Sequence, residues 1–244
     1  ILPLTCRLKD KWVFLLACVL LIQPLPLYYV IRACLDPSFI TPAIPTRSFW
    51  DATFAVQSHG SFLETVRVNL WEGQIASLAW AWDHGRVFQT AALFLLGMLI
   101  GRRGLFQKEN LKVWNKILAG ALIAFFPLYG LGNMLPAFIV NKSILTPLSL
   151  IITSLSNFSF MLVLVSGVIF AFYNTNMHYL LMKITPYGKM SLTNYITQSI
   201  VGSMLYYNWG FALHNQCGIT VSCLAGIAFF ILQFTFCRWW MSHH

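Results

Sequence analysis

The sequence predicts an all-α fold, a polytopic transmembrane helix bundle with about six membrane-spanning helices. Of its 244 residues, 58% are hydrophobic and only 9% are charged, whereas soluble domains average about 25% charged residues. The apolar residues form long segments, and the basic residues lie between them. The net charge of +9 raises the question of nucleic-acid binding, but no amphipathic element gathers the basic residues. We therefore expect membrane lipids as partners and no nucleic acid.

Five of the six spans are identified by length and hydropathy alone. The first of them is interrupted by two prolines, Pro24 and Pro26. The others are long enough to cross a hydrocarbon core of about 30 Å. These five spans cover about residues 12–31, 113–135, 147–173, 190–211 and 218–237.

The remaining span, second in chain order, is short for a crossing. Its strongly apolar part, residues 87–100, would measure about 21 Å at 1.5 Å per residue, less than the roughly 30 Å required. We therefore expect one continuous helix from about residue 78 to residue 100. Asp83 and Arg86 would then lie near the outer interface, three residues apart on one helix face, where they can pair.

The basic residues set the orientation, because cytoplasmic loops are enriched in Lys and Arg. With the N-terminus inside, eleven of the 16 basic residues are cytoplasmic and five are outside, so both termini of this chain are expected to be cytoplasmic. The cytoplasmic group is Arg7, Lys9, Lys11, Arg102, Arg103, Lys108, Lys112, Lys116, Lys183, Lys189 and Arg238, and the outer group is Arg32, Arg47, Arg67, Arg86 and Lys142.

The long external connection divides the chain into three segments: a first transmembrane helix (1–35), an external loop (36–77) and a C-terminal transmembrane domain (78–244). The loop opens with several prolines and should begin as extended chain. Residues 62–70 then read as a short helix with one apolar side, which either lies on the outer leaflet or forms a lid over a cavity. Because the chain starts at Ile1 and ends directly after a span, we expect further protein on both sides.

A polar stripe runs along the fifth span. Ser191, Asn194 and Gln198 fall on one face at 100° per residue, and Gly202 continues it. Polar side chains at membrane depth are costly unless they face protein or a watery cavity, so this face should point inward, with Gly202 at a close helix approach. The stripe either lines a ligand site, with Asn157 as a partner across the bundle, or makes interhelical hydrogen bonds only.

Three cationic residues on the cytoplasmic side are candidates for binding an anion. Lys189 leads into the polar stripe, and Arg102 and Arg103 follow the second span. They can meet an anionic head group or the phosphates of an acyl carrier. The alternative for the two arginines is an ordinary cytoplasmic anchor.

The nearest approach to an acid–base cluster is Asp83, His84 and Arg86, at the external entrance of the second span. These three are the candidate catalytic residues, although Asp83 and Arg86 can instead simply pair with each other. His214, on the same side, is either a base or a solvated loop residue. No histidine or cysteine spacing matches a metal site, so no metal is expected.

Two further patterns concern packing. Gly97 and Gly101 have the small-xxx-small spacing that permits close helix approach in lipid. Cys34 and Cys217 both fall at the outer surface in this topology, and whether they form a disulfide in an oxidising compartment is left open by the sequence.

Two segments of the chain resemble the signature segments of the YeiB-like family of bacterial membrane proteins, domain of unknown function 418. They are Arg86-Val-Phe-Gln-Thr-Ala-Ala-Leu-Phe-Leu-Leu-Gly-Met-Leu-Ile-Gly-Arg-Arg-Gly104 and Gly188-Lys-Met-Ser-Leu-Thr-Asn-Tyr-Ile-Thr-Gln-Ser199. The resemblance covers roughly residues 75–244, and Lys189 stands where Arg is commoner in the family. It implies a multi-pass protein of the bacterial cytoplasmic (inner) membrane, distantly similar to membrane acyltransferases.

The resemblance and the residues together give two functional hypotheses. The first is an acyltransferase-like protein that moves an acyl group to a sugar or lipid acceptor, which needs a base, a donor pocket and dipoles for an oxyanion. No cofactor pattern is evident, but this hypothesis implies an acyl carrier such as acyl-CoA. The alternative is a non-enzymatic transporter or lipid-handling protein whose polar fifth helix lines a pathway. The oligomeric state is left open.

Overall fold

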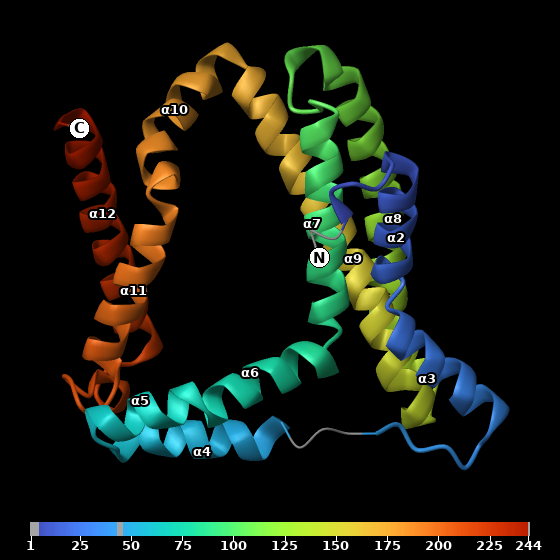
Figure 1. Ribbon diagram of the computed structural model, residues 1–244, viewed down its shortest axis with the longest axis horizontal. Coiled ribbons are helices and arrows are strands. Elements are labelled where there is room, and N and C mark those ends of the chain that lie inside the picture. Colours follow the sequence, from blue (N-terminus) through green and yellow to red (C-terminus); the bar gives the residue numbers. More distant parts are fainter. Residues whose placement is uncertain (1–4, 43–45, 244) are drawn as a thin grey trace. The chain divides into compact units, whose positions relative to one another are not determined.

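The computed structural model describes residues 5–42 and 46–243, and that part of the chain is helical without strands, which confirms the all-α prediction. Figure 1 labels the α-helices in chain order. They are α2 (Asp10–Leu21), α3 (Pro24–Leu35), α4 (Thr46–His59), α5 (Phe62–Leu70), α6 (Glu72–Asp83), α7 (Arg86–Arg102), α8 (Leu111–Phe138), α9 (Lys142–Tyr173), α10 (Thr175–Lys189), α11 (Ser191–Tyr206) and α12 (Ile219–His243).

The chain forms two compact units. The first unit comprises Ile1–Ile44 and Ala79–Tyr173, and the second comprises Pro45–Leu78 and Asn174–His244. Each unit has its own helix contacts and its own polar network, so each is described by itself.

The length and hydropathy of several helices indicate a membrane protein. Among the described residues, α8, α9 and α12 are long and apolar enough to cross a bilayer, and the number rises to five if each of two bent helix pairs counts as one span. The predicted fifth span appears as α11, which has 16 residues. At 1.5 Å per residue it measures about 24 Å, short of a full crossing of about 30 Å, and it is not among the three to five candidate spans.

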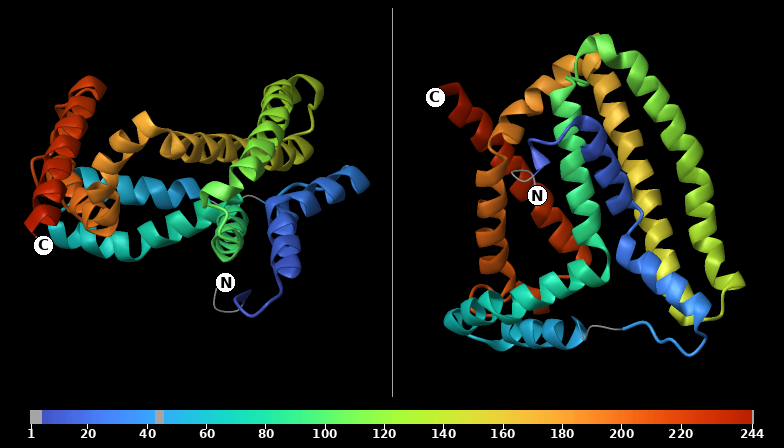
Figure 2. Two further views of the ribbon diagram at one scale, coloured as in Figure 1. Left: turned by 90° about the horizontal axis from the view of Figure 1, so that it is seen from above. Right: turned by 45° about the vertical axis from the view of Figure 1, so that its right-hand side comes forward.

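In the first unit, α9 is the central helix. The long helix α8 packs along it, and α3 crosses its N-terminal half; Figure 2 shows α8 and α9 side by side in its right-hand view. On the other side of the unit, α2 packs against α7 through the buried side chains of Val13, Ala17, Leu95 and Leu99.

Both bent helix pairs begin or end in the first unit, and a residue in the left-handed region marks each bend. Between α2 and α3 the axis turns by 50° at Gln23, which has φ 61°. Pro24 and Pro26 begin the next helix and lack the N–H groups that would continue the previous one. Between α6 and α7 the turn is 76°, at Gly85 with φ 63°.

The break at Gly85 corrects the predicted second span. Residues 78–83 are helical as expected, but they belong to α6, and the helix that contains residues 87–100 starts only at Arg86. A left-handed residue cannot continue a right-handed helix, and glycine adopts that conformation without a Cβ clash. Span length alone therefore gave the wrong start for this helix.

In the second unit, α5 lies against α4, and α10 packs on α12. The bounds of α5, Phe62–Leu70, agree with the predicted short helix, and a capping box between Ser61 and Glu64 starts it. Its predicted apolar side, Phe62, Leu63, Val66 and Leu70, is solvent-accessible, as an interfacial helix requires. Helices α4 and α10 were not anticipated.

Three predicted close approaches are not found within the described residues of the unit that holds each glycine. Cβ atoms built on Gly97, Gly101 and Gly202 would meet nothing within 4 Å. The small-xxx-small spacing of Gly97 and Gly101 therefore has no packing role inside the described part of the first unit. Cys34 and Cys217 are both free thiols.

Candidate functional site

A polar cavity of about 320 Å³ lies in the first unit where the break between α6 and α7 faces α9. Nine of its ten lining residues are of polar types, in a chain that is 58% hydrophobic, although carbon atoms of these side chains make up most of the wall surface. The wall is made by Asp83, His84, Arg86, Gln89, Thr146, Ser149, Leu150, Thr153, Ser154 and Asn157. The three predicted catalytic candidates, Asp83, His84 and Arg86, all line this cavity.

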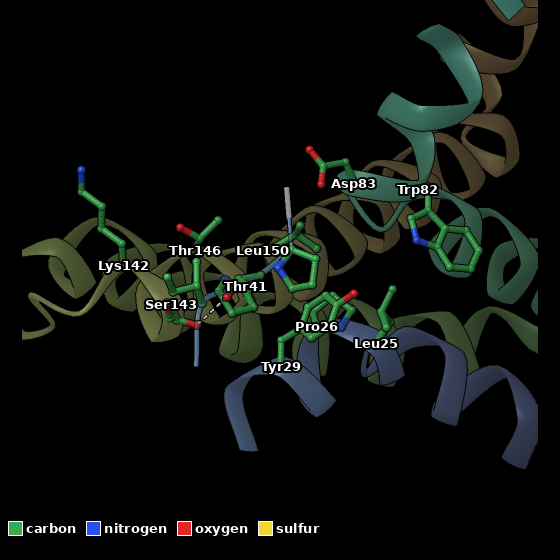
Figure 3. A pocket seen from close by; sticks show the side chains of 13 residues that line it. Leu25, Pro26, Tyr29, Thr41, Trp82, Asp83, Lys142, Ser143, Thr146 and Leu150 are labelled. Atoms are coloured by element: carbon green, nitrogen blue, oxygen red, sulfur yellow. Dashed lines mark hydrogen bonds between the residues drawn. The ribbon is translucent and has the colours of Figure 1, made fainter. Parts of the chain in front are cut away.

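A second cavity of about 310 Å³ adjoins the first. More of its lining residues are apolar, among them Leu25, Pro26 and Tyr29 of α3 (Figure 3). The extended chain after α3 closes one side, where the Thr41 hydroxyl donates a hydrogen bond to the Ser143 carbonyl at 3.1 Å. The two cavities share Asp83, Thr146 and Leu150 as lining residues. We call them the polar cavity and the apolar cavity.

Asp83 and Arg86 do not form the predicted ion pair. Asp83 ends α6 and Arg86 begins α7, so the break at Gly85 separates two residues that would face each other on a continuous helix. Arg86 Nη1 instead donates to Gln89 Oε1 at 2.9 Å, and its guanidinium lies 5.9 Å from the ring centre of Trp80. The salt bridges among the described residues both involve Asp10.

His84 is oriented by the backbone of α6. Its Nδ1 lies 3.0 Å from the Trp80 carbonyl oxygen, and its ring stacks on the Trp80 ring at 4.9 Å. A carbonyl oxygen only accepts hydrogen bonds, so in the neutral ring Nδ1 carries the proton and Nε2 carries the lone pair. This arrangement leaves a basic nitrogen on a residue of the cavity wall.

Two lining residues of the polar cavity, Gln89 and Ser154, belong to a buried chain of hydrogen bonds. Gln89 donates to the Ser154 carbonyl at 3.2 Å, and Gln23 donates to the Ser154 hydroxyl at 2.9 Å. Gln23 is fully buried, its Oε1 has no partner among the described residues, and Gly85 packs directly on its amide. The two helix breaks therefore touch each other beside Ser154. The sequence analysis missed Gln23, Gln89 and Ser154; an amide directly before a proline inside an apolar span was the available signal.

The predicted polar stripe belongs to a network in the second unit. Asn194 is buried, as predicted, and its amide donates to the Tyr187 carbonyl at 3.0 Å. Gln198 donates to the Tyr187 hydroxyl and to Gln233 Oε1, both at 2.9 Å, and Gln233 donates to the Asn194 carbonyl at 3.2 Å. Cys237 completes the network by donating to Asn194 Oδ1.

These partners account for the amides of the stripe by hydrogen bonding between helices α10, α11 and α12. The predicted pairing with Asn157, which lies in the first unit, remains a prediction. Ser191, Gln198 and Lys189 are exposed, so of the predicted inward face only Asn194 is buried within this unit. A ligand-binding role for the stripe remains a prediction, and Tyr187 and Gln233 are the network members that the sequence analysis missed.

Arg102 and Arg103 join the end of α7 to the start of α2. Their guanidinium groups lie 3.3 Å and 3.1 Å from the carboxylate oxygens of Asp10. Arg102 also donates to the carbonyls of Leu8 and Cys6. Their structural role is therefore clear, while binding of an anionic head group remains a prediction. No group of three metal-ligating side chains occurs within the described residues.

Comparison with known proteins places the chain in a family. The sequence model of a family described as "Protein of unknown function (DUF418)" matches residues 100–244, more than half of the chain. The chain belongs to the DUF418 family. The matched region contains α9, which forms one wall of both cavities, and the whole polar network, whereas Asp83, His84 and Arg86 precede it.

One relative of this DUF418 protein is Uncharacterized protein YxaH of Bacillus subtilis (strain 168), which is 29% identical over 77 residues. That alignment covers 32% of this chain and 19% of the relative, so the chain matches about a fifth of the relative's length. No solved structure matches the chain.

Proposed function

We propose that this DUF418 protein binds an amphiphilic molecule in the adjoining polar and apolar cavities and transfers its acyl group to a hydroxyl acceptor, with His84 as the general base. The observation that carries the proposal is the pair of cavities, one lined mostly by polar residues and one by more apolar residues, that share Asp83, Thr146 and Leu150. Each volume is near the lower end of the roughly 300–1,000 Å³ of small-molecule sites. Together, the two cavities have room for a polar head group and part of an acyl chain.

The polar and apolar lining residues indicate where each part of the ligand would bind. An acyl chain fits against Leu25, Pro26 and Tyr29, and the reacting carbonyl then lies near the residues that both cavities share. Asn157 lines the polar side and carries N–H donors for the oxyanion.

The proton transfers use the free nitrogen of His84. Nε2 takes the proton of the acceptor hydroxyl as its oxygen bonds to the acyl carbon. The bond from the acyl carbon to the carrier's sulfur or oxygen then breaks, and the imidazolium returns the proton to that leaving atom. No oxidant or metal is needed for this balance.

The predicted orientation sets the side on which the acceptor is found. If the eleven cytoplasmic basic residues fix the topology, both cavities open toward the outer side of a bacterial cytoplasmic membrane, and the acceptor is a sugar or a lipid on that side. The acyl donor is an acyl carrier such as acyl-CoA or an acylated lipid.

The test uses the purified chain in lipid nanodiscs, with radiolabelled octanoyl-CoA as donor and bacterial lipid extract as acceptor. His84→Gln is expected to lower acyl transfer about 100-fold or more, the range for loss of a general base. The matched control is His214→Gln in the second unit, because the Nδ1 of His214 lies 2.8 Å from a backbone carbonyl in the same way. Transfer by His84→Gln at the wild-type rate, or no transfer by the wild type, would overturn the enzymatic proposal.

One observation favours a second function, lipid handling without chemistry. The imidazole of His84 is held by a backbone carbonyl rather than by a carboxylate, so the group that stabilises an imidazolium in Ser-His-Asp enzymes is missing. A wild-type protein that binds lipid in the cavities and transfers no acyl group supports this alternative.

A further inference from the structure

We propose that the amphiphile carries a zwitterionic head group, with an ammonium group bound by Asp83 and a phosphate or carboxylate bound by Arg86. The inference rests on the proposed binding of an amphiphile and adds the chemical class of its head group. Its basis is that two opposite charges line one cavity without neutralising each other.

The helix break keeps the two charges apart. On a continuous helix, residues at positions i and i+3 are neighbours, and an Asp–Arg pair would close on itself. The left-handed conformation of Gly85 and the 76° turn separate Asp83 on α6 from Arg86 on α7. Each charge thus remains open to a ligand that lies between the two helices.

The anionic subsite is built around Arg86. One of its five N–H groups is used by Gln89, which is itself held by the Ser154 carbonyl, so the guanidinium is oriented and its other donors remain for a ligand. The start of α7 adds to the positive potential, because Gly85 provides no side-chain cap for its first N–H groups. Thr153 and Asn157 contribute further hydrogen-bond donors on the same wall.

The cationic subsite is Asp83, which lines both cavities. Figure 3 shows Asp83 on α6 and Lys142 at the start of α9, on different walls of the apolar cavity. No salt bridge joins Asp83 to Lys142 within the described part of the chain. Asp83 lines the same cavity as Arg86, so a head group whose phosphate is bound by Arg86 can bring its terminal ammonium group to Asp83.

The test is lipid selectivity, measured by native mass spectrometry of the purified chain with phosphatidylethanolamine and phosphatidylglycerol. These two lipids share the phosphate, but only phosphatidylethanolamine carries an ammonium group. The wild type is expected to bind phosphatidylethanolamine at least tenfold more tightly. Asp83→Asn should abolish that preference without weakening phosphatidylglycerol binding, whereas Arg86→Gln should weaken both lipids.

Two further variants act as controls. Asp83→Glu keeps the charge and should keep the preference, and Asp51→Asn, on α4 of the second unit, removes an exposed carboxylate elsewhere and should change nothing. Equal binding of the two lipids by the wild type, or an unchanged preference in Asp83→Asn, overturns the zwitterion inference alone. Failure of either lipid to bind the wild type would count against the proposed function itself.

Discussion

Gly85→Ala probes the contact between the two helix breaks, on which the geometry of both cavities depends. Gly85 has φ 63°, and a Cβ atom there would lie 2.3 Å from Gln23 Oε1 and 2.8 Å from Leu150 Cδ2. The left-handed conformation costs an L-residue about 1–2 kcal/mol, and overpacking adds about 1–3 kcal/mol. Gly85→Ala should therefore destabilise the protein by about 2–5 kcal/mol, which corresponds to a fall in Tm of roughly 5–20 °C for a chain of this size.

The assay is thermal unfolding of the purified protein in detergent, followed by the loss of its helical circular dichroism. Gly120→Ala is the matched control, because its Cβ would meet nothing within 4 Å and it lies inside helix α8. Adding Gln23→Ala to Gly85→Ala removes one partner of the clash, so the double variant should be more stable than the sum of the two single effects predicts. A Gly85→Ala protein as stable as the wild type would refute the close contact between Gly85 and Gln23. Strict additivity of the two stability losses would show that the loss does not come from a clash with Gln23.

Other positions give independent tests, all by thermal unfolding. Gln233→Leu removes three hydrogen bonds, each worth about 0.6 kcal/mol in a membrane protein. The double variant Gln233→Leu with Gln198→Leu should lose less stability than the two single variants lose together. Full additivity of the two stability losses would contradict a shared network. Asp10→Asn should lower Tm at low salt and less so at roughly 1 M NaCl, because the pair with Arg103 is exposed; an equal effect at both salt concentrations would contradict an electrostatic role. Gly97→Ala should leave Tm and oligomeric state unchanged, and a fall in either would mean that another helix packs there.

Local signals predicted much of the fold. The long helices α8, α9 and α12 follow from continuous apolar length, and α5 follows from its amphipathic pattern and cap. The sequence analysis missed the break between α6 and α7 because it relied on span length and did not treat the glycine at residue 85 as a possible turn. The shortness of residues 87–100 suggested a longer helix, whereas the chain turns there instead.

The candidate site was predicted in part, for a physical reason. Asp83, His84 and Arg86 stood out because ionisable residues beside an apolar span are rare and costly. Gln23 and Ser154 are neutral and 131 residues apart, and no local pattern announces a hydrogen bond at that separation. The partners of Gln198 were missed in the same way, since Gln233 is the one amide side chain of α12 and lies 35 residues away.

The most direct test of the account is photo-crosslinking with a phosphatidylethanolamine whose acyl chain carries a diazirine, with the modified residues located by peptide mass spectrometry. If the paired cavities hold the amphiphile, adducts should form on Tyr29 and Leu150, which line the apolar cavity, and unlabelled phosphatidylethanolamine should compete with them. Adducts confined to exposed positions such as Ile123 of α8, without competition, would contradict the claim that these cavities are the binding site.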